Sequence, residues 1–282
     1  MTNSKPIAES DTEQQWEALR QSGIYIPKKP DILLQIEELL QSPDFQLSQI
    51  ADLARKDPGL SARFLHIVNS PANNLDKEVT SVDNAIFILG AYRTLNLCRA
   101  IMLERTFDEV TPALEIFWKR SGFIAELTVA ITNRQETGFS SDLAYLMGLF
   151  HACGVIVLAN NIPGYSDALA NEETWAHLDD HGRKFGVDHV LVSYLISQHW
   201  HLPKIVSKGI LLQRGISGYL IKNEEGYQSE EQLCTGLVSS LQLALLMYNR
   251  LMLGNYASEW EITREACRSF LNMSEEEFSR FV

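Results

Sequence analysis

Apolar residues recur along most of the chain at the three- and four-residue spacing of amphipathic helices. The stretch DILLQIEELL, which begins at Asp31, shows the pattern clearly. One face of the helix that it predicts would carry Ile32, Leu33, Ile36, Leu39 and Leu40. The alternation of apolar and polar residues that marks a half-buried strand is almost absent. The pattern therefore predicts an all-α fold, a multi-helix bundle.

Local signals indicate where several helices begin. Asp57 precedes Pro58 and is placed as an N-cap, with the proline in the first helical position. Thr80 to Asp83 has the spacing of a capping box. Asp188 is placed to cap a helix that begins at His189. Beyond residue 90 we expect helices over residues 92–102, 112–134, 142–160, 172–184, 188–201, 203–214, 231–253, 259–270 and 274–281.

The chain divides into three parts by pattern and charge. Residues 1–22 are expected to be an N-terminal extension, residues 23–215 the main domain, and residues 216–282 a small acidic helical subdomain. Residues 223–282 contain 10 acidic and 4 basic side chains, a net charge of 4 − 10 = −6 out of −12 for the whole chain. Such an excess is typical of a solvated face, and a surface that meets a partner protein is the alternative.

Composition narrows the class of protein. The net charge of −12 and the absence of a basic run argue against duplex nucleic acid as a partner. The apolar stretches 143–159 and 233–253 are too short or too polar for membrane spans and are expected to be buried helices. Four widely spaced cysteines indicate reduced thiols, and the N-terminus has no secretory pattern, so we expect a cytoplasmic protein.

Histidines are the main candidates for chemistry, because the chain has no phosphate-binding glycine loop and no GxSxG motif. His177 and His181 stand four apart in HLDDH, which suits either a metal pair or, as we expect, a solvated helix end. His151 lies in the apolar stretch LFHACG. A histidine followed by aspartate on a buried helix can bind divalent metal ions, but position 152 is alanine, whose methyl group cannot act as a ligand.

The sequence at this point resembles the HDOD domain family, degenerate relatives of the HD-type phosphohydrolases that are similar to HD-GYP phosphodiesterases. The resemblance covers Gly23 to Gly215 and is specific because many short matches occur in one order. The matching stretches are IPKKPDILLQIEELL, DPGLSARFLHIVNSPANN, VTSVDNAIFILGAYRTLNL, FWKRS, LMGLFHACG and FGVDHVLVSYLISQHWHLP. The resemblance implies an all-helical domain of bacterial signalling that commonly lacks hydrolytic activity.

The resemblance also implies where a metal site would lie. The ligand histidine of active relatives would fall near Arg120, the His-Asp pair has become His151-Ala152, and the late histidine pair is replaced by GILLQRG with Gln213. Only His151 and His189 remain, so no metal cofactor is expected.

These replacements make the former metal pocket more positive. We expect Arg120, Lys119, His151, His189 and Gln213 to be near it, and Arg120 to bind an anion such as a nucleotide phosphate or a carboxylate. In the alternative, Arg120 points to solvent beside Glu126 or Glu115, and side chains fill the pocket.

Three functions remain open. The first is a non-catalytic regulatory module that binds other signalling proteins. The second is a metal-dependent phosphohydrolase built on His151 and His189 with an acid such as Asp142 or Asp167. The third is a sensor of a small anionic or nucleotide ligand. Because 282 residues leave no room for an attached cyclase or receiver module, any output is expected to pass through a separate protein.

Overall fold

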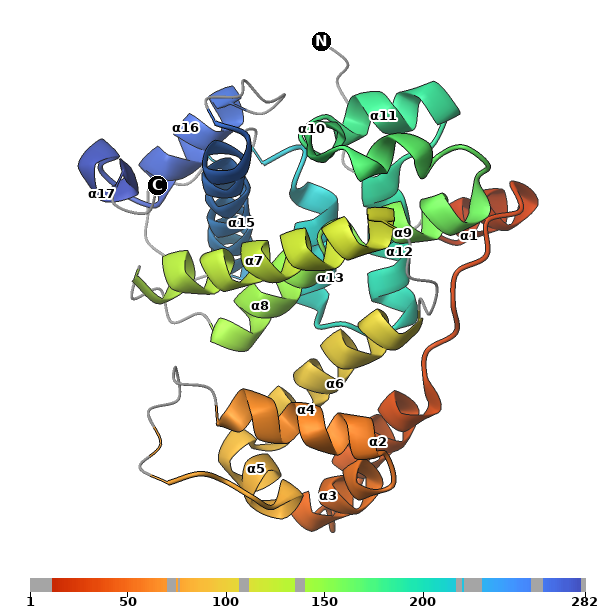
Figure 1. Ribbon diagram of the computed structural model, residues 1–282, viewed down its shortest axis with the longest axis vertical. Helices are drawn as coiled ribbons and strands as arrows, with labels where there is room; N and C mark the ends of the chain where they lie inside the picture. Colours follow the sequence, from red (N-terminus) through yellow and green to blue (C-terminus); the bar gives the residue numbers. More distant parts are fainter. Residues whose placement is uncertain are drawn as a thin grey trace. The chain divides into compact units, whose positions relative to one another are not determined.

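The computed structural model describes residues 12–69, 75, 77–106, 112–134, 140–216, 220, 230–254 and 261–279. These residues form helices and no strand, so the all-α prediction is confirmed. The chain divides into two compact units, one of residues 27–108 and one of residues 1–26 with 109–282 (Figure 1).

The described residues of the unit 27–108 form the helices α2 (Asp31–Gln41), α3 (Leu47–Arg55), α4 (Pro58–Val68), α5 (Val82–Leu89) and α6 (Ala91–Thr106). Helix α5 packs against α3, α4 and α6, and α2 packs against α3 and α6. The fully buried core side chains include Leu33, Ile36, Ile50, Leu60, Phe64 and Ile86.

Two predicted helix starts in this unit have different outcomes. Asp57 caps α4 as expected, because its Oδ1 accepts a hydrogen bond from the Leu60 amide at 2.9 Å. The capping box predicted at Thr80 is wrong by one residue. The Ser81 hydroxyl accepts from the Asn84 amide at 3.1 Å, and α5 begins at Val82.

The other unit contains the remaining helices. They are α1 (Thr12–Gln21), α7 (Pro112–Arg134), α8 (Ser141–Phe150), α9 (Gly154–Asn161), the 3-10 turn η3 (Asp167–Ala170), α10 (Glu172–Trp175), α11 (Leu178–Phe185), α12 (His189–His199), α13 (Lys204–Leu212), α15 (Glu230–Leu253), α16 (Glu261–Phe270) and α17 (Glu275–Ser279). Part of the predicted N-terminal extension is thus helix α1.

Helix α7 lies at the centre of this unit and packs against α8 and α15 (Figure 1). A Cβ atom on Gly148 of α8 would lie 2.4 Å from the Cα atom of Ala125 of α7, so the two backbones meet directly. Helix α13 packs against α12, α15 and α8, and α12 also packs against α9. Helices α7, α8, α12, α13 and α15 are therefore connected by direct packing contacts.

The helix predicted over residues 142–160 is broken. Helix α8 ends at Phe150 and α9 starts at Gly154, with residues 151–153 in a turn. Helix α12 approaches the chain closely beside the break: a Cβ on Gly154 would lie 2.3 Å from the His189 carbonyl oxygen, and the Gly154 amide donates to the Ser193 hydroxyl at 2.8 Å. The break places His151 at the C-terminal end of α8.

The helix predicted over residues 172–184 is also divided, into α10 and α11. His177 precedes α11 as its N-cap, and so it does not share a helical face with His181. His181 is buried rather than solvated, with its Nε2 atom 2.9 Å from the Tyr165 carbonyl oxygen and its ring against Tyr165 and Phe185. The predicted solvated helix end is therefore wrong for His181.

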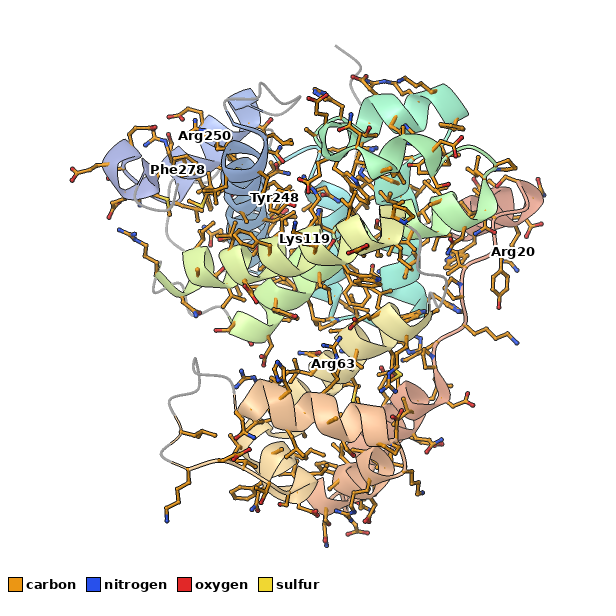
Figure 2. The ribbon with its side chains drawn as sticks, in the orientation of Figure 1. Arg20, Arg63, Lys119, Tyr248, Arg250 and Phe278 are labelled. Atoms are coloured by element: carbon orange, nitrogen blue, oxygen red, sulfur yellow. The ribbon has the colours of Figure 1, made fainter. Side chains whose placement is uncertain are left out.

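The predicted acidic subdomain begins in a segment, residues 216–229, of which the structure describes only Ile216 and Leu220. Beyond it, α15 packs against α7, α8, α13 and α16. The Arg250 guanidinium lies 4.9 Å from the centre of the Phe278 ring and links α15 to α17 (Figure 2). The division into residues 1–22, 23–215 and 216–282 stays a prediction.

Among the described residues, two helical stretches, Ser141–Asn161 and Glu230–Leu253, are long and apolar enough to cross a membrane, and the bent pair α5–α6 would be a third as one broken span. The expectation that residues 143–159 and 233–253 are too short or too polar for membrane spans is therefore wrong. Within this fold, 78% of the first apolar window and 72% of the second are buried, as expected of buried helices.

Candidate functional site

Arg120 of α7 is a buried charged side chain, with 3% of its surface exposed. Its Nη2 atom donates to Asn249 Oδ1 at 3.1 Å and lies 3.5 Å from the Trp175 carbonyl oxygen, while its Nη1 atom has no partner. The guanidinium lies 4.5 Å from the centre of the Tyr248 ring. Burial lowers the pKa of Arg120 to about 10, so the group stays protonated at neutral pH. The alternative that Arg120 points to solvent is wrong.

His151 is fixed by the turn after α8. Its Nδ1 atom lies 2.6 Å from the Gly148 carbonyl oxygen, which can only accept, so Nδ1 carries the proton and Nε2 keeps a free lone pair. Burial, together with the charge of Arg120, lowers the pKa of His151 to about 4. The ring is therefore neutral at physiological pH.

His189 is the first residue of α12, and Asp188 caps this helix as predicted, accepting from the Leu191 amide at 3.0 Å. The His189 Nδ1 atom lies 3.5 Å from Arg214 Nη2 and 3.7 Å from Asp179 Oδ1. Burial, and next the charge of Arg214, lowers the pKa of His189 to about 3. This imidazole is also neutral, and it is buried rather than on the surface.

An ion-pair cluster of Arg214, Asp179 and Asp188 lies beside His189. Arg214 donates to the carboxylate of Asp179 and, at 2.5 Å, to that of Asp188. Burial raises the pKa of Asp179, and Arg214 opposes that rise in part. The sequence prediction did not include Asp179 or Arg214 among the site residues. A single helix was expected over residues 172–184, and nothing in the segments HLDD and GILLQR indicates that they meet in the fold.

Gln213 joins the turn of His151 to α15. Its Nε2 atom donates to the His151 carbonyl oxygen at 2.9 Å and to that of Ile210 at 3.0 Å. The Gln213 carbonyl oxygen accepts from Gln242 Nε2 at 2.8 Å, and Gln242 Oε1 is left without a partner. Gln213 thus links the turn that contains His151, helix α13 and helix α15 through hydrogen bonds.

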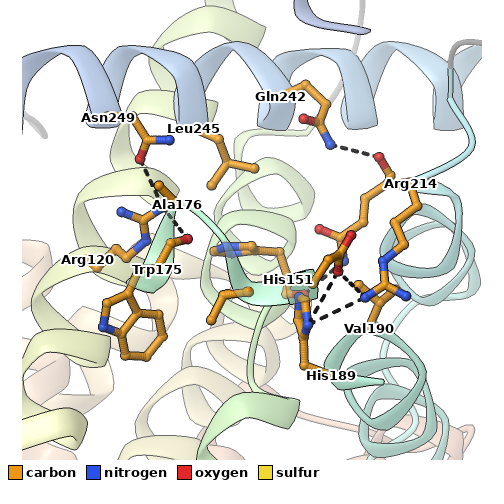
Figure 3. Close-up of a pocket in the computed structure, with 13 residues that line it drawn as sticks. Arg120, His151, Trp175, Ala176, His189, Val190, Arg214, Gln242, Leu245 and Asn249 are labelled. Atoms are coloured by element: carbon orange, nitrogen blue, oxygen red, sulfur yellow. Dashed lines mark hydrogen bonds and ion pairs between the residues drawn. The ribbon is translucent and has the colours of Figure 1, made fainter. Parts of the chain in front are cut away.

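These groups enclose one pocket of about 60 Å³ (Figure 3). In Figure 3, Arg120 and Asn249 lie on one side, His189 and Arg214 on the other, and His151 between them. The lining residues are Arg120, His151, Trp175, Ala176, Leu178, Asp179, His189, Val190, Gln213, Arg214, Gln242, Leu245 and Asn249.

Four of the five predicted site residues, namely Arg120, His151, His189 and Gln213, therefore meet at this pocket. The fifth, Lys119, is exposed on α7 and does not line it (Figure 2). Whether the four bind a ligand stays a prediction.

The donor set does not fit the metal centre of HD-type hydrolases. Asp142, in the first turn of α8, and Asp167, exposed at the start of η3, do not line the pocket. The one carboxylate that does, Asp179, is already paired with Arg214, and Ala152 offers only a methyl group. Within the described part of the chain, no three His, Cys, Asp or Glu side chains are placed to hold a metal ion. Two guanidinium groups line the same small space and would repel a cation.

The fold places the chain in the class of all-helical proteins. A family model of the HDOD domain matches residues 26–216, which is more than half of the chain. The chain belongs to the HDOD domain family, as the sequence resemblance predicts.

Solved structures agree with this fold. An "HDOD domain protein with unknown function" from Geobacter sulfurreducens is 22% identical, with a TM-score of 0.64 over 97% of this chain and 92% of that one. A "Putative signal transduction protein" from Marinobacter aquaeolei is 18% identical, with a TM-score of 0.67 over 98% and 64% of the two chains. A "Putative metal-dependent phosphohydrolase" from Shewanella amazonensis is 16% identical, with a TM-score of 0.60 over 97% and 100%.

At such identities these likenesses concern the fold alone. Among curated proteins, an "Uncharacterized protein" of Treponema pallidum is 26% identical over 187 residues, 64% of this chain. The match spans only 36% of that relative's length.

Proposed function

We propose that this chain is a non-catalytic HDOD module of bacterial signal transduction, which regulates other signalling proteins by binding them. The observation that carries the proposal is the composition of the pocket. It has two neutral imidazoles, two guanidiniums and a single carboxylate that is already ion-paired. Such a lining favours an anion over a divalent cation, so we propose that the pocket holds an anionic ligand that modulates partner binding.

The alternative is a phosphohydrolase with a rearranged metal site, and one observation favours it. His151 donates from Nδ1 to a backbone carbonyl and keeps Nε2 free, the arrangement in which histidines usually bind metals. Asp179 and His189, 3.7 Å apart, would be the other ligands. This alternative requires the metal ion to displace Arg214 from Asp179.

Assays of metal binding and of hydrolysis distinguish the regulatory module from the phosphohydrolase. Metal-free protein is titrated with Mn²⁺ and Zn²⁺ by calorimetry, and hydrolysis of bis(4-nitrophenyl) phosphate and cyclic di-GMP is assayed with each ion. We expect no stoichiometric binding and no turnover. Stoichiometric metal together with hydrolysis that disappears in His151→Ala would establish the phosphohydrolase and refute the regulatory module.

The partner would be a separate signalling protein. Cross-linking in the native bacterium, followed by reconstitution of the complex from purified components, is expected to give saturable binding. We also propose a cytoplasmic location, which is supported by the wide spacing of the four cysteines along the sequence.

A further inference from the structure

Three polar atoms without partners are gathered in the pocket of Arg120. They are Nη1 of Arg120, Nε of Arg214 and Oε1 of Gln242, each buried and without a hydrogen-bond partner among the described residues. Buried polar atoms in native proteins are nearly all paired, with protein, with ordered water or with a ligand. Two unpaired donors and an unpaired acceptor around one cavity therefore indicate a polar occupant.

The charges around the pocket indicate the sign and size of the occupant's charge. Arg214 is neutralised by the carboxylates of Asp179 and Asp188. Both imidazoles are neutral. Arg120 makes its close contacts with amide, carbonyl and aromatic groups. The charge of Glu172 acts on Arg120, but no carboxylate of the described residues forms an ion pair with it within 4.0 Å. A buried guanidinium without an ion pair is costly unless a counter-ion accompanies it. The positive charge of Arg120 therefore favours an occupant with one negative charge.

The acceptors in the pocket indicate a second property. Gln242 Oε1 accepts hydrogen bonds and cannot donate them, and it has no partner in the described part of the chain. The Nε2 atom of His151, which also lines the pocket, can likewise only accept when Nδ1 carries the proton. A fully ionised anion without hydrogen would satisfy Arg120 but would leave these acceptors unpaired. The occupant therefore needs an O–H or N–H donor as well as a negative charge.

The volume limits the size of the occupant. A water-sized group requires about 10–15 Å³ of such space, so about 60 Å³ holds roughly four to six non-hydrogen atoms. Small-molecule pockets commonly measure about 300–1,000 Å³. A nucleotide or cyclic dinucleotide is far larger than this cavity.

We infer that the pocket binds a small, singly charged oxyanion that carries a hydrogen-bond donor, such as a hydroxy carboxylate or dihydrogen phosphate. Arg120 Nη1 donates to its charged oxygen, and Gln242 and His151 accept from its donor group. This inference rests on the proposed regulatory function and names the ligand class of that pocket. It replaces the nucleotide phosphate that the sequence also allowed.

Two pairs of small anions test the inference on the wild-type chain. Glycolate is compared with acetate, and phosphate with sulfate, by calorimetry at pH 6.5. In each pair the first member carries an O–H donor that the second lacks. We expect the first member of at least one pair to bind and to do so about three- to tenfold more tightly than its match. The pair that binds more tightly shows whether the natural ligand is a carboxylate or a phosphate.

Two neighbouring residues of α7 give matched variants. Arg120→Gln and Lys119→Gln each remove one positive charge, but Lys119 is exposed and lies outside the pocket. We expect Arg120→Gln to weaken binding at least tenfold and Lys119→Gln to leave it within twofold. The comparison of anion pairs uses the wild-type chain, so it still tests the ligand class of the pocket if Arg120→Gln does not fold.

Three results would overturn the inference: no binding in either pair, equal affinities within every pair that binds, or cyclic di-GMP binding that depends on Arg120. These results concern the ligand of the pocket, whereas binding of a partner protein and the lack of hydrolysis are tested separately by reconstitution of the complex and by the metal and hydrolysis assays.

Discussion

His151 keeps the hydrogen bond of a metal ligand in surroundings that no longer suit a metal. Its Nδ1 atom donates to the Gly148 carbonyl oxygen, in the same way that histidine ligands in metal sites donate to backbone carbonyls. The residue that follows is a buried alanine, and the charge of Arg120 contributes to the lowered pKa of His151. We therefore expect this side chain to act as a neutral hydrogen-bond acceptor instead of a metal ligand.

The neutral state of His151 predicts a loss of stability in mild acid. Its pKa of about 4 in the folded protein lies below about 6.5 in the unfolded chain, so the unfolded state binds the proton first as the pH falls. The stability contribution of the neutral ring is complete above pH 6.5 and is lost as the pH falls towards 4. Between pH 7 and pH 5 this loss is about 2 kcal/mol.

Urea unfolding at pH 7 and pH 5 measures this loss. His151→Asn keeps a donor for the Gly148 carbonyl oxygen but does not titrate, so its stability should fall by about 2 kcal/mol less than that of the wild type over this interval. Equal pH dependence of the two proteins would show that His151 is not held neutral by burial.

The sequence predicted which residues lie at the site better than it predicted which side chains they contact. The replacements at positions 120 and 152 were visible in the sequence once the resemblance was known, and four of the five candidate residues do line one pocket. Lys119 does not, because on a helix its side chain points about 100° away from that of Arg120. Asp179 and Arg214 are 35 residues apart. Asp179 lies on α11 and Arg214 follows α13, and α12 packs against both helices, so only tertiary packing brings the two side chains together.

At the scale of elements, the site lies at the break between α8 and α9. His151 is in this break and lines the pocket, and α12 approaches the neighbouring Gly154 more closely than a side chain there would allow. Terminal signals such as Asp57 and Asp188 identified α4 and α12 from sequence, since capping is a local interaction. The break was not predicted from the local pattern, and Gly154 contacts residues about 40 positions away in the chain.

Two glycine substitutions test the role of this contact. In Gly154→Ala the new Cβ atom would lie 2.3 Å from the His189 carbonyl oxygen and 2.6 Å from the Ser193 amide nitrogen, both backbone atoms of α12. We expect a loss of about 3 kcal/mol in the free energy of unfolding, measured by chemical denaturation.

Gly122→Ala is the matched control, because Gly122 lies within α7 and a Cβ atom there would meet nothing within 4 Å. This change should stabilise the protein by about 0.5–1 kcal/mol, since alanine favours the helix. A Gly154→Ala protein as stable as the wild type would mean that α9 and α12 do not pack so closely.

At the scale of the molecule, the pocket depends on α15. This helix supplies Gln242, Leu245 and Asn249 to the lining and packs against α7, α8 and α13. A chain that ends at Gly215, the predicted end of the main domain, would expose the buried faces of these helices. We expect it to lose its near-ultraviolet circular dichroism and to aggregate on size-exclusion chromatography.

A chain that ends at Gly254 keeps α15 and removes α16 and α17, and it should retain a monodisperse folded state. If the chain that ends at Gly215 folds cooperatively instead, residues 216–282 form a separate subdomain, as the sequence division proposed.

The sequence by itself determined the all-helical class, the family and the loss of the His-Asp pair. These properties follow from periodicity, capping and residue identity, which act over a few positions along the chain. Tertiary structure alone decided that Arg120 is buried without a carboxylate, that Arg214 neutralises Asp179, and that the cavity is about 60 Å³. Charge balance and cavity volume depend on which distant side chains meet in space, and no local pattern encodes that meeting.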